Sequence, residues 1–142
     1  MGPPPTLIDS GPLIALFDSD DRWHGPVAEW LSGNRRQFVT SWCVLTEVCA
    51  TLPTRLWLQC LEFVDAGGAS VINLPYAFLS KILAWQYKYA DMPMDLADAS
   101  LLALADHVGA TDIITLDEDF TVYRVPNRLI LANPLKEWWH AR

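Results

Sequence analysis

The chain is short of the residues that carry the commoner kinds of enzyme chemistry. Its three histidines, His24, His107 and His140, lie far apart and lack the spacing of metal ligands or of a catalytic pair. The nucleophile motif GxSxG, the phosphate-binding loop GxxxxGK(S/T) and the dinucleotide fingerprint GxGxxG are absent. These absences exclude histidine-based hydrolysis, P-loop nucleotide hydrolysis and dinucleotide-dependent redox chemistry as first hypotheses.

Disulfides and membrane-spanning segments have little support. The three cysteines, Cys43, Cys49 and Cys60, are odd in number and lack CxxC spacing, which predicts reduced, buried thiols rather than disulfides or a zinc site. The apolar runs IALF, WCVL and SLLALA are far shorter than the roughly 20 residues that a bilayer crossing requires. The opening residues MGPPPT lack the charged and apolar regions of a signal peptide. We therefore expect a soluble, cytoplasmic protein.

Positive charge is scarce, because 10 lysines and arginines stand against 17 acids and the formal net charge is −7. That balance argues against a polyanionic partner such as nucleic acid. If several acids share a metal site, however, one divalent ion brings the charge to about −5 and two bring it to about −3. The basic residues are then free to form a local phosphate-binding rim: Arg22, Arg35, Arg36, Arg55, Lys81, Lys88, Arg124 and Arg128.

Strand signals alternate with helix signals along the 142 residues, which we expect to form one domain over residues 1–142 with residues 1–5 as a flexible N-terminus. Strands are predicted at residues 6–9, 37–41, 70–74 and 111–117, with an optional fifth at 128–133. Helices are predicted at residues 12–18, starting with Pro12, and at 24–32, 44–52, 56–68, 76–90 and 96–109. This order predicts an α/β fold, a three-layer α/β/α sandwich with a mostly parallel central sheet.

Four carboxylates interrupt hydrophobic segments: Asp9, Glu47, Asp98 and Asp117. Asp9 and Asp117 each end a predicted strand, and the carboxyl ends of parallel strands meet at one edge of a sheet. Glu47 has mainly apolar neighbours at helical spacing, and Asp98 opens the most hydrophobic helix of the chain. An unpaired charge in low dielectric costs several kcal/mol, so this group needs a compensating cation. Carboxylate oxygens suit Mg²⁺ or Mn²⁺ better than zinc.

The sequence leaves a structural interpretation open for several of these acids. Asp9 stands before Ser-Gly, which is good turn and capping chemistry. Asp95 and Asp98 lie three residues apart at a helix start, where free amide groups favour both, so spacing does not decide which one is a ligand. We assign ligation to Asp98 and a capping or supporting role to Asp95. Supporting roles are also predicted for Ser10, Thr115 and Asp119.

Three segments, taken together, resemble the PIN-domain ribonucleases, and within them the VapC toxins of bacterial and archaeal toxin-antitoxin pairs. They are LIDSGPLIALFD at residues 7–18, TEV at 46–48 and DLADASLLALADHVGATDIITLDEDF at 95–120. The last is the most specific, because an acid-led alanine-rich helix, a short strand and T-x-D-x-D-F occur in the order and spacing of the family. With the helices between them, the similarity spans residues 6–135.

By this resemblance, Asp9, Glu47, Asp98 and Asp117 match the metal-binding acids of the family, and Asp119 matches a neighbouring position that is often acidic. The resemblance implies a Mg²⁺- or Mn²⁺-dependent endoribonuclease that hydrolyses RNA phosphodiester bonds. It also implies a homodimer and a cognate antitoxin whose carboxyl tail enters the acidic groove. We expect Asp9 and Asp98 to hold the principal ion, which activates water for in-line attack, while Glu47 and Asp117 complete the cage.

Other functions stay open on the sequence. A stand-alone PIN-type RNA-processing nuclease would use the same acids. A metal-dependent phosphatase with an aspartyl nucleophile needs a second Asp two residues after the first, where this chain has Gly11. A receiver domain has adjacent acids after its first strand, where this chain has Ser10 after Asp9. A noncatalytic RNA- or protein-binding module is the last alternative, although all four acidic positions are filled.

Aromatic residues are frequent between residues 55 and 89 and occur again at Trp138 and Trp139. Helical core packing is their predicted role, and a surface for a second copy or an antitoxin is the alternative. Aromatic rings also stack on RNA bases, although nothing in this spacing selects that role.

Overall fold

The sheet of the protein is small and parallel. The computed structural model describes residues 2–124 and 130–142. Within them, four strands are hydrogen-bonded in the order β3-β2-β1-β4, so that β1 lies between β2 and β4. The strands are β1 Thr6–Ile8, β2 Phe38–Thr40, β3 Ser70–Val71 and β4 Asp112–Ile114.

Helices make all the connections between the strands. The pair α1 Ser10–Phe17 and α2 His24–Gly33 joins β1 to β2, and α3 Trp42–Thr51 and α4 Thr54–Asp65 join β2 to β3. The pair α5 Phe78–Lys88 and α6 Leu96–Val108 joins β3 to β4, after which come the 3-10 helix η1 Glu118–Thr121 and α7 Pro134–His140.

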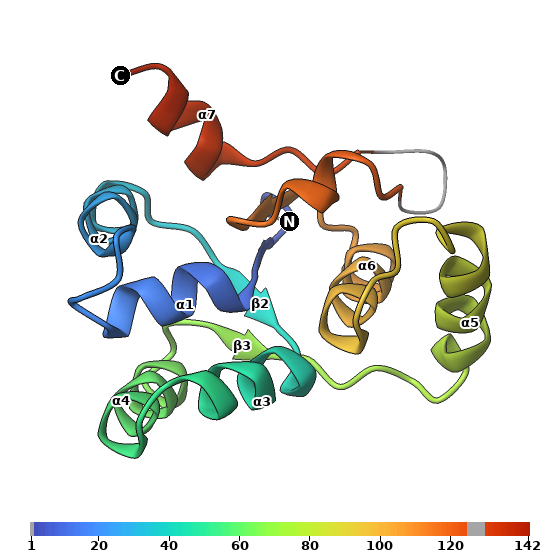
Figure 1. Ribbon diagram of the computed structural model, residues 1–142, viewed down its shortest axis with the longest axis horizontal. Helices are drawn as coiled ribbons and strands as arrows, with labels where there is room; N and C mark the ends of the chain where they lie inside the picture. Colours follow the sequence, from blue (N-terminus) through green and yellow to red (C-terminus); the bar gives the residue numbers. More distant parts are fainter. Residues whose placement is uncertain (1, 125–129) are drawn as a thin grey trace.

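The strand order places the helices on both faces of the sheet. The chain winds from β1 through β2 to β3 in one direction and then crosses back to β4 on the far side of β1. Right-handed crossovers put helices on opposite faces when the direction of winding reverses. Figure 1 shows α1 to α4 on one side of the sheet and α5 and α6 on the other. The predicted three-layer α/β sandwich is confirmed, and its winding reverses between β1 and β4.

Burial on both faces explains why the strands are continuous apolar runs. Leu7 and Ile8 of β1 and Ile113 and Ile114 of β4 are fully buried. Alanines alternate with leucines in α6, and their small side chains let this helix pack closely in the core. Gly109 ends α6 at a φ of 72°, a left-handed conformation that glycine adopts without a steric penalty.

Two predicted features of the fold were wrong. The optional strand at residues 128–133 is reduced to an isolated bridge between Asp112 and Ala132, while residues 128 and 129 lie outside the described residues. The first helix begins at Ser10 rather than at Pro12, because the Asp9 side chain caps it. Pro12 then lies in the first helical turn, where a missing N–H group removes no helical hydrogen bond.

The remaining expectations concern side chains. The three cysteines are free thiols; Cys60 is buried, whereas Cys43 and Cys49 are half-buried. The aromatic side chains between residues 55 and 89 include both core and surface residues, since Trp85 is buried in the core and Tyr87 is 82% exposed.

Within residues 2–124 and 130–142, every helix is too short or too polar to cross a membrane.

Candidate functional site

Asp9 lies at the carboxyl end of β1 and is only 4% exposed. Its backbone N–H donates to the carbonyl oxygen of Ile114 at 3.1 Å, which joins β1 to β4 at this point. One carboxylate oxygen of Asp9, Oδ1, accepts a hydrogen bond from the backbone N–H of Ser10 at 2.8 Å. Asp9 is therefore both the N-cap of α1 and a buried carboxylate at the reversal point of the sheet, where ligands bind in folds of this type.

A buried hydroxyl links Asp9 to the second strand-end acid. Thr115 Oγ1 donates to Asp9 Oδ2 at 2.6 Å and accepts from the backbone N–H of Asp117 at 3.0 Å. The carbonyl oxygen of Thr115 accepts in turn from Asn133 Nδ2 at 2.9 Å. Thr115 thus holds the Asp9 carboxylate and the Asp117 backbone in a fixed relation. Sequence reasoning missed Asn133, because its position before Pro134 indicates only a helix start.

Asp117 and Asp119 lie in the turn after β4. Asp117 is the N-cap of η1, and its Oδ1 accepts from the backbone N–H of Asp119 at 2.9 Å. Both side chains are half-buried, whereas Glu118 between them is exposed. This turn therefore fixes Asp117 beside the sheet.

Glu47 reaches the same region from α3. It is half-buried, and one of its carboxylate oxygens, Oε1, accepts a hydrogen bond from Ser10 Oγ. The position of α3 is set at its first turn, where Ser41 Oγ accepts from the backbone N–H of Val44 at 3.1 Å. The same hydroxyl forms a buried hydrogen bond of 2.7 Å with Ser100 Oγ of α6. Ser41 and Ser100 were not predicted as supporting residues, because their only signal in the sequence was the capping preference of serine.

Asp98 lies in the first turn of α6 and is half-buried. Asp95 is the exposed N-cap of that helix, and its Oδ1 accepts from the backbone N–H of Asp98 at 2.8 Å. The Asp98 carboxylate is not itself used in the cap and is free to face the other acids. Because α3 and α6 are in contact, their two acids are brought toward the strand ends together.

The electrostatics show that the predicted acids act on one another. Burial raises the pKa of Asp9 from its ordinary value of 3.8 to about 6, and the charges of Glu47 and Asp117 add to the effect; hydrogen bonds from Thr115 and Ser10 oppose it.

The pKa of Asp98 rises further, from 3.8 to about 8, first through burial and then through the charges of Asp9, Asp95, Asp117 and Glu47. The groups that perturb these two carboxyls include acids but no lysine, arginine or histidine. Asp9 and Asp98 therefore lie in the field of the other acids with no basic side chain among the groups that act on them, and we refer to Asp9, Glu47, Asp98 and Asp117 as the carboxylate cluster.

The donor chemistry of this cluster fits a hard divalent cation. Its members are carboxylates supported by hydroxyl groups, without the thiolate or imidazole ligands that favour zinc. Among the described residues, no three acidic, histidine or cysteine side chains already lie close enough together to hold an ion. To share one cation, the carboxylates would therefore have to move closer to one another.

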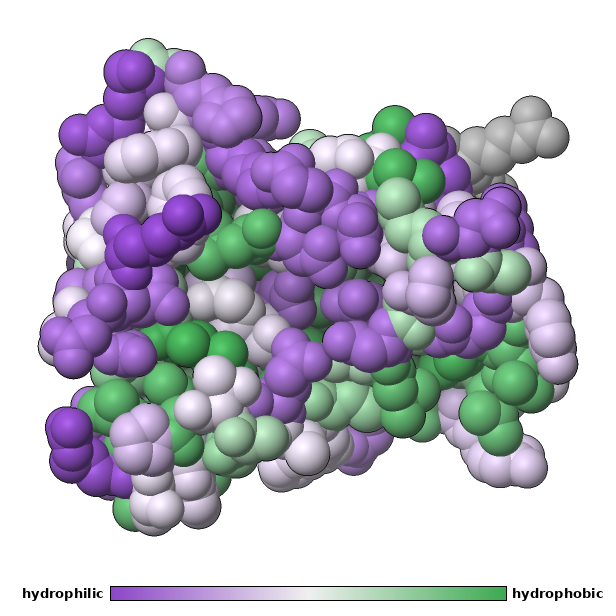
Figure 2. All heavy atoms as spheres, in the orientation of Figure 1, coloured by the Kyte–Doolittle hydropathy of each residue, from purple (hydrophilic) through white to green (hydrophobic). Residues whose placement is uncertain are grey.

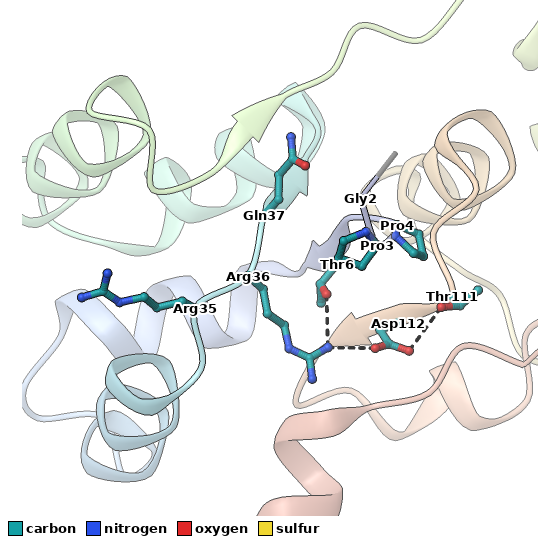
Figure 3. Close-up of a pocket in the computed structure, with 9 residues that line it drawn as sticks. All are labelled: Gly2, Pro3, Pro4, Thr6, Arg35, Arg36, Gln37, Thr111 and Asp112. Atoms are coloured by element: carbon teal, nitrogen blue, oxygen red, sulfur yellow. Dashed lines mark hydrogen bonds and ion pairs between the residues drawn. The ribbon is translucent and has the colours of Figure 1, made fainter.

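A hollow of about 780 Å³ lies at the opposite end of the strands from the carboxylates, and arginine side chains contribute to its lining. Figure 3 shows Arg36 reaching Thr6 and Asp112, which begin β1 and β4. The Arg36 guanidinium forms an ion pair of 2.8 Å with Asp112, so its charge is already compensated. Arg35 points away from this pair in the same view. The pairing of Arg36 with Asp112 here contrasts with the like-charged acids at the carboxyl ends of the strands.

The chain is similar to a known family, to a curated relative and to a solved structure. The profile of the family described as PIN domain matches residues 6–126. Ribonuclease VapC26 of Mycobacterium tuberculosis (strain ATCC 25618 / H37Rv) is 29% identical over an alignment of 115 residues, and the match covers 78% of this chain and 85% of the relative. The crystal structure of Mycobacterium tuberculosis VapC20, a Sarcin-Ricin loop cleaving toxin, has a TM-score of 0.72 at 16% identity and covers 80% of this chain and 91% of that chain. The structural match shows a common fold, and the family match contains all four acids of the cluster.

Proposed function

The chain belongs to the PIN-domain family, and on this basis we propose that it is a Mg²⁺- or Mn²⁺-dependent endoribonuclease that hydrolyses RNA phosphodiester bonds. The observation that carries the proposal is the cluster of Asp9, Glu47, Asp98 and Asp117, in which burial and then the charges of the other acids raise the pKa values of Asp9 and Asp98 without a basic partner. A site of this kind stabilises a folded chain poorly but suits a cation that must also attract a phosphate.

Each acid has a distinct part in this proposal. Asp9 and Asp98 hold the ion, Glu47 and Asp117 complete its surroundings, and Ser10 and Thr115 orient two of the carboxylates by donating hydrogen bonds. When bound, a divalent ion supplies Lewis-acid chemistry, by polarising the scissile phosphate and lowering the pKa of water. The chain itself contributes the four carboxylates, two of them oriented by hydroxyl groups, and excludes bulk water on the side of the buried Asp9.

The physiological role that we propose is that of a toxin in a toxin-antitoxin pair, acting on RNA in the cytoplasm. It is supported by the relatives, one named a VapC ribonuclease and the other a VapC toxin. The partner would be an antitoxin that blocks the carboxylate cluster. A stand-alone RNA-processing nuclease is the alternative, and co-expression with the product of a neighbouring reading frame separates the two. Suppression of RNA cleavage by that product supports the toxin role.

We also propose that the protein forms a homodimer. On α5, Leu79, Leu83 and Tyr87 are spaced by four residues and are between 47% and 82% exposed, so they form one apolar stripe. Figure 2 shows hydrophobic side chains gathered at the lower right of the molecule, on the side where α5 lies. Monomeric proteins seldom leave such a stripe uncovered. Light scattering on the purified protein measures whether its mass is that of one chain or two.

Incubation of the purified protein with RNA tests the proposed activity. Cleavage is expected with Mg²⁺ or Mn²⁺ and is expected to stop when EDTA is added. The variant Asp9→Asn should lose more than about a hundredfold in cleavage rate, because it removes a charge that holds the ion. The matched control is Asp65→Asn, the same change at the exposed end of α4, which should cleave at the normal rate. Metal-independent cleavage, or full activity of Asp9→Asn, would contradict the proposal.

A further inference from the structure

Two adjoining hollows lie between the start of α2 and α7. Their volumes are about 280 and 290 Å³, and both are lined by Arg22, Trp23, Pro26 and Trp139. Helices α2 and α7 contact each other here, although they are separated by about a hundred residues of sequence. Figure 1 shows α7 lying across the α2 end of the molecule. We refer to these two hollows together as the tryptophan pocket.

Aromatic rings form the walls of the tryptophan pocket. The Trp23 and Trp139 rings pack edge to face, with centroids 5.3 Å apart and an interplanar angle of 74°. Trp139 is 39% exposed, so part of its ring is open to a ligand. The Arg22 guanidinium lies 5.3 Å from the centroid of the Trp23 ring. Exposed aromatic faces beside arginine are the groups on which the bases of single-stranded nucleic acids stack.

Positive charge gathers in the tryptophan pocket although the chain as a whole is acidic. Arg22, Lys136 and His140 line the hollow that also contains Trp139. Among residues 2–124 and 130–142, no carboxylate lies within ion-pair distance of Arg22. Of the basic residues expected to form a phosphate-binding rim, Arg22 lies here, and Lys136 lines the same hollow.

One carboxylate, that of Glu118, also lines the tryptophan pocket. It lies 2.7 Å from Lys136 Nζ, an ammonium group that is covered from solvent and makes no hydrogen bond of good geometry. The Glu118 side chain is 80% exposed, so it can turn into solvent, and the Lys136 ammonium group is then free to bind a phosphate. Lysine binds phosphate as a point charge and does not need a fixed orientation.

The tryptophan pocket adjoins the carboxylate cluster along the chain. Leu116 and Glu118 line the pocket, and Asp117 of the cluster lies between them. Neighbouring Cα atoms are about 3.8 Å apart, so one wall of the pocket begins next to the position of an expected metal ligand. Asp117 itself lines a further hollow that shares Glu118, Lys136 and His140 with the tryptophan pocket, so an RNA strand whose scissile phosphate lay at the cluster has a continuous path to the pocket.

We propose, on the basis of the proposed ribonuclease activity, that the tryptophan pocket binds a nucleotide of the substrate RNA next to the scissile phosphate. The base stacks on Trp139, and Arg22 and Lys136 contact the backbone phosphate. The site takes single-stranded RNA, because a base must leave its partner strand to stack on a side chain. The pocket therefore supplies the affinity for RNA that the acidic cluster lacks.

Binding of a fluorescein-labelled, single-stranded RNA of about 12 nucleotides tests this assignment. Fluorescence anisotropy is measured in Mg²⁺ on the Asp9→Asn protein, with a gel to verify that the RNA stays intact. Adding Arg22→Gln should weaken binding about three- to tenfold and should reduce the slope of log affinity against log salt by about 0.7, the value for one lost phosphate contact. Adding Trp139→Leu should weaken binding about tenfold and leave that slope unchanged, because stacking releases no counterions.

Matched controls separate stacking and charge from folding. Trp139→Phe keeps an aromatic ring and should bind within about twofold of the parent, whereas Trp139→Leu keeps only apolar volume. Arg55→Gln removes the same charge from the exposed surface of α4 and should leave both affinity and salt slope unchanged. Thermal unfolding of each variant shows that the fold is intact.

Two results would overturn the assignment of RNA binding to the tryptophan pocket while leaving the ribonuclease proposal in place. One is wild-type cleavage of RNA together with Arg22→Gln and Trp139→Leu variants that bind RNA like Arg55→Gln. The other is unchanged RNA binding with weakened binding of a labelled polyglutamate peptide, which would assign the pocket to an acidic protein partner. Loss of both RNA cleavage by the wild-type protein and RNA binding by Asp9→Asn would overturn the pocket and the ribonuclease proposal together.

Discussion

At the scale of single residues, Thr115 has the most connected position in the site. Its hydroxyl group donates to the buried Asp9 carboxylate and accepts from the Asp117 backbone, and its carbonyl oxygen accepts from Asn133. Thr115 is almost fully buried, so water does not easily replace a lost partner. Outer groups of this kind fix the orientation of the acids that a metal requires.

Thr115→Val should therefore lower the rate of metal-dependent RNA cleavage about ten- to hundredfold. Valine has nearly the shape of threonine but leaves both Asp9 Oδ2 and the Asp117 N–H group without this partner. Thr115→Ser keeps the hydroxyl group and should retain most of the activity. Cleavage rates of the two variants, measured in saturating Mg²⁺, check the expectation. Equal rates for Thr115→Val and the wild-type protein would show that the hydroxyl does not orient Asp9.

Asp98 gives the site a pH dependence whose sign follows from its raised pKa. Burial and the neighbouring acids raise this pKa to about 8 in the folded protein, against 3.8 as the ordinary value. Between these two pH values the folded state holds a proton that the unfolded state has released. Since stability falls with pH wherever the folded state binds more protons, the metal-free protein should lose stability from about pH 4 to pH 8.

Asp98→Asn removes the group responsible and should make the metal-free protein more stable at pH 8, by an amount on the order of 1 kcal/mol once solvent screening of this half-buried side chain is allowed for. At pH 4 the difference should be small, because Asp98 is then protonated and resembles asparagine. Urea unfolding of both proteins at the two pH values measures the effect. A difference that does not grow with pH would contradict the raised pKa.

Much of the site was predictable at this scale, but its supporting groups were not. Asp9, Glu47, Asp98 and Asp117 could be found because acids in apolar segments conflict with burial. Ser10 and Thr115 were adjacent to two of these acids and were expected to orient carboxylates, which their hydrogen bonds do. Asn133 was missed because it comes from a distant part of the chain, and no local pattern encodes that contact.

At the scale of elements, the site depends on how α3 and α6 are held together. These helices carry Glu47 and Asp98, and a buried hydrogen bond of 2.7 Å joins Ser41 before α3 to Ser100 within α6. Ser100 Oγ also donates to the carbonyl oxygen of Ala97 at 2.6 Å. Ser41 therefore supplies the proton of the bond between the two serines, since the Ser100 proton is already used.

Ser100→Ala should reduce the free energy of unfolding by about 1–2 kcal/mol, because it leaves the buried Ser41 hydroxyl without its acceptor. The matched control is Ser32→Ala on α2, where the serine is exposed and bonds only to Glu29 in its own helix. That change should stay within about 0.5 kcal/mol. Denaturant unfolding measures both variants. Equal stabilities would show that the link between α3 and α6 does not hold the helices in place.

Element types were predictable because periodicity and capping signals are local, whereas the ends of elements depend on tertiary contacts. The alternation of strands and helices is confirmed throughout residues 2–124. Helix α1 begins at Ser10, two residues before the predicted start, because Asp9 of the site is its N-cap. Residues 130–133 pair with the sheet only at Ala132. A single isolated bridge at a sheet edge has too few neighbours to be distinguished from a loop by pattern alone.

At the scale of the whole molecule, the strand order explains why the acids meet. Reversal of the winding between β1 and β4 opens a crevice at their carboxyl ends, and Asp9 and Asp117 lie there. Acidic and basic side chains are also distributed unevenly over the molecule. The net charge of −7 includes four carboxylates in one cluster, whereas Arg22 and Lys136 line the tryptophan pocket, to which the sequence neighbours of Asp117 also contribute. Repulsion and attraction of RNA are thus separated within one surface.

The central claim is that Asp9, Glu47, Asp98 and Asp117 bind one divalent cation, and calorimetric titration with Mn²⁺ tests it most directly. The wild-type protein should bind Mn²⁺ saturably, and Asp98→Asn should weaken that binding at least about tenfold because it removes a ligand charge. The control Asp65→Asn should bind like the wild type, since its carboxylate lies outside the cluster on α4. Equal Mn²⁺ affinity in the wild-type and Asp98→Asn proteins would contradict the account.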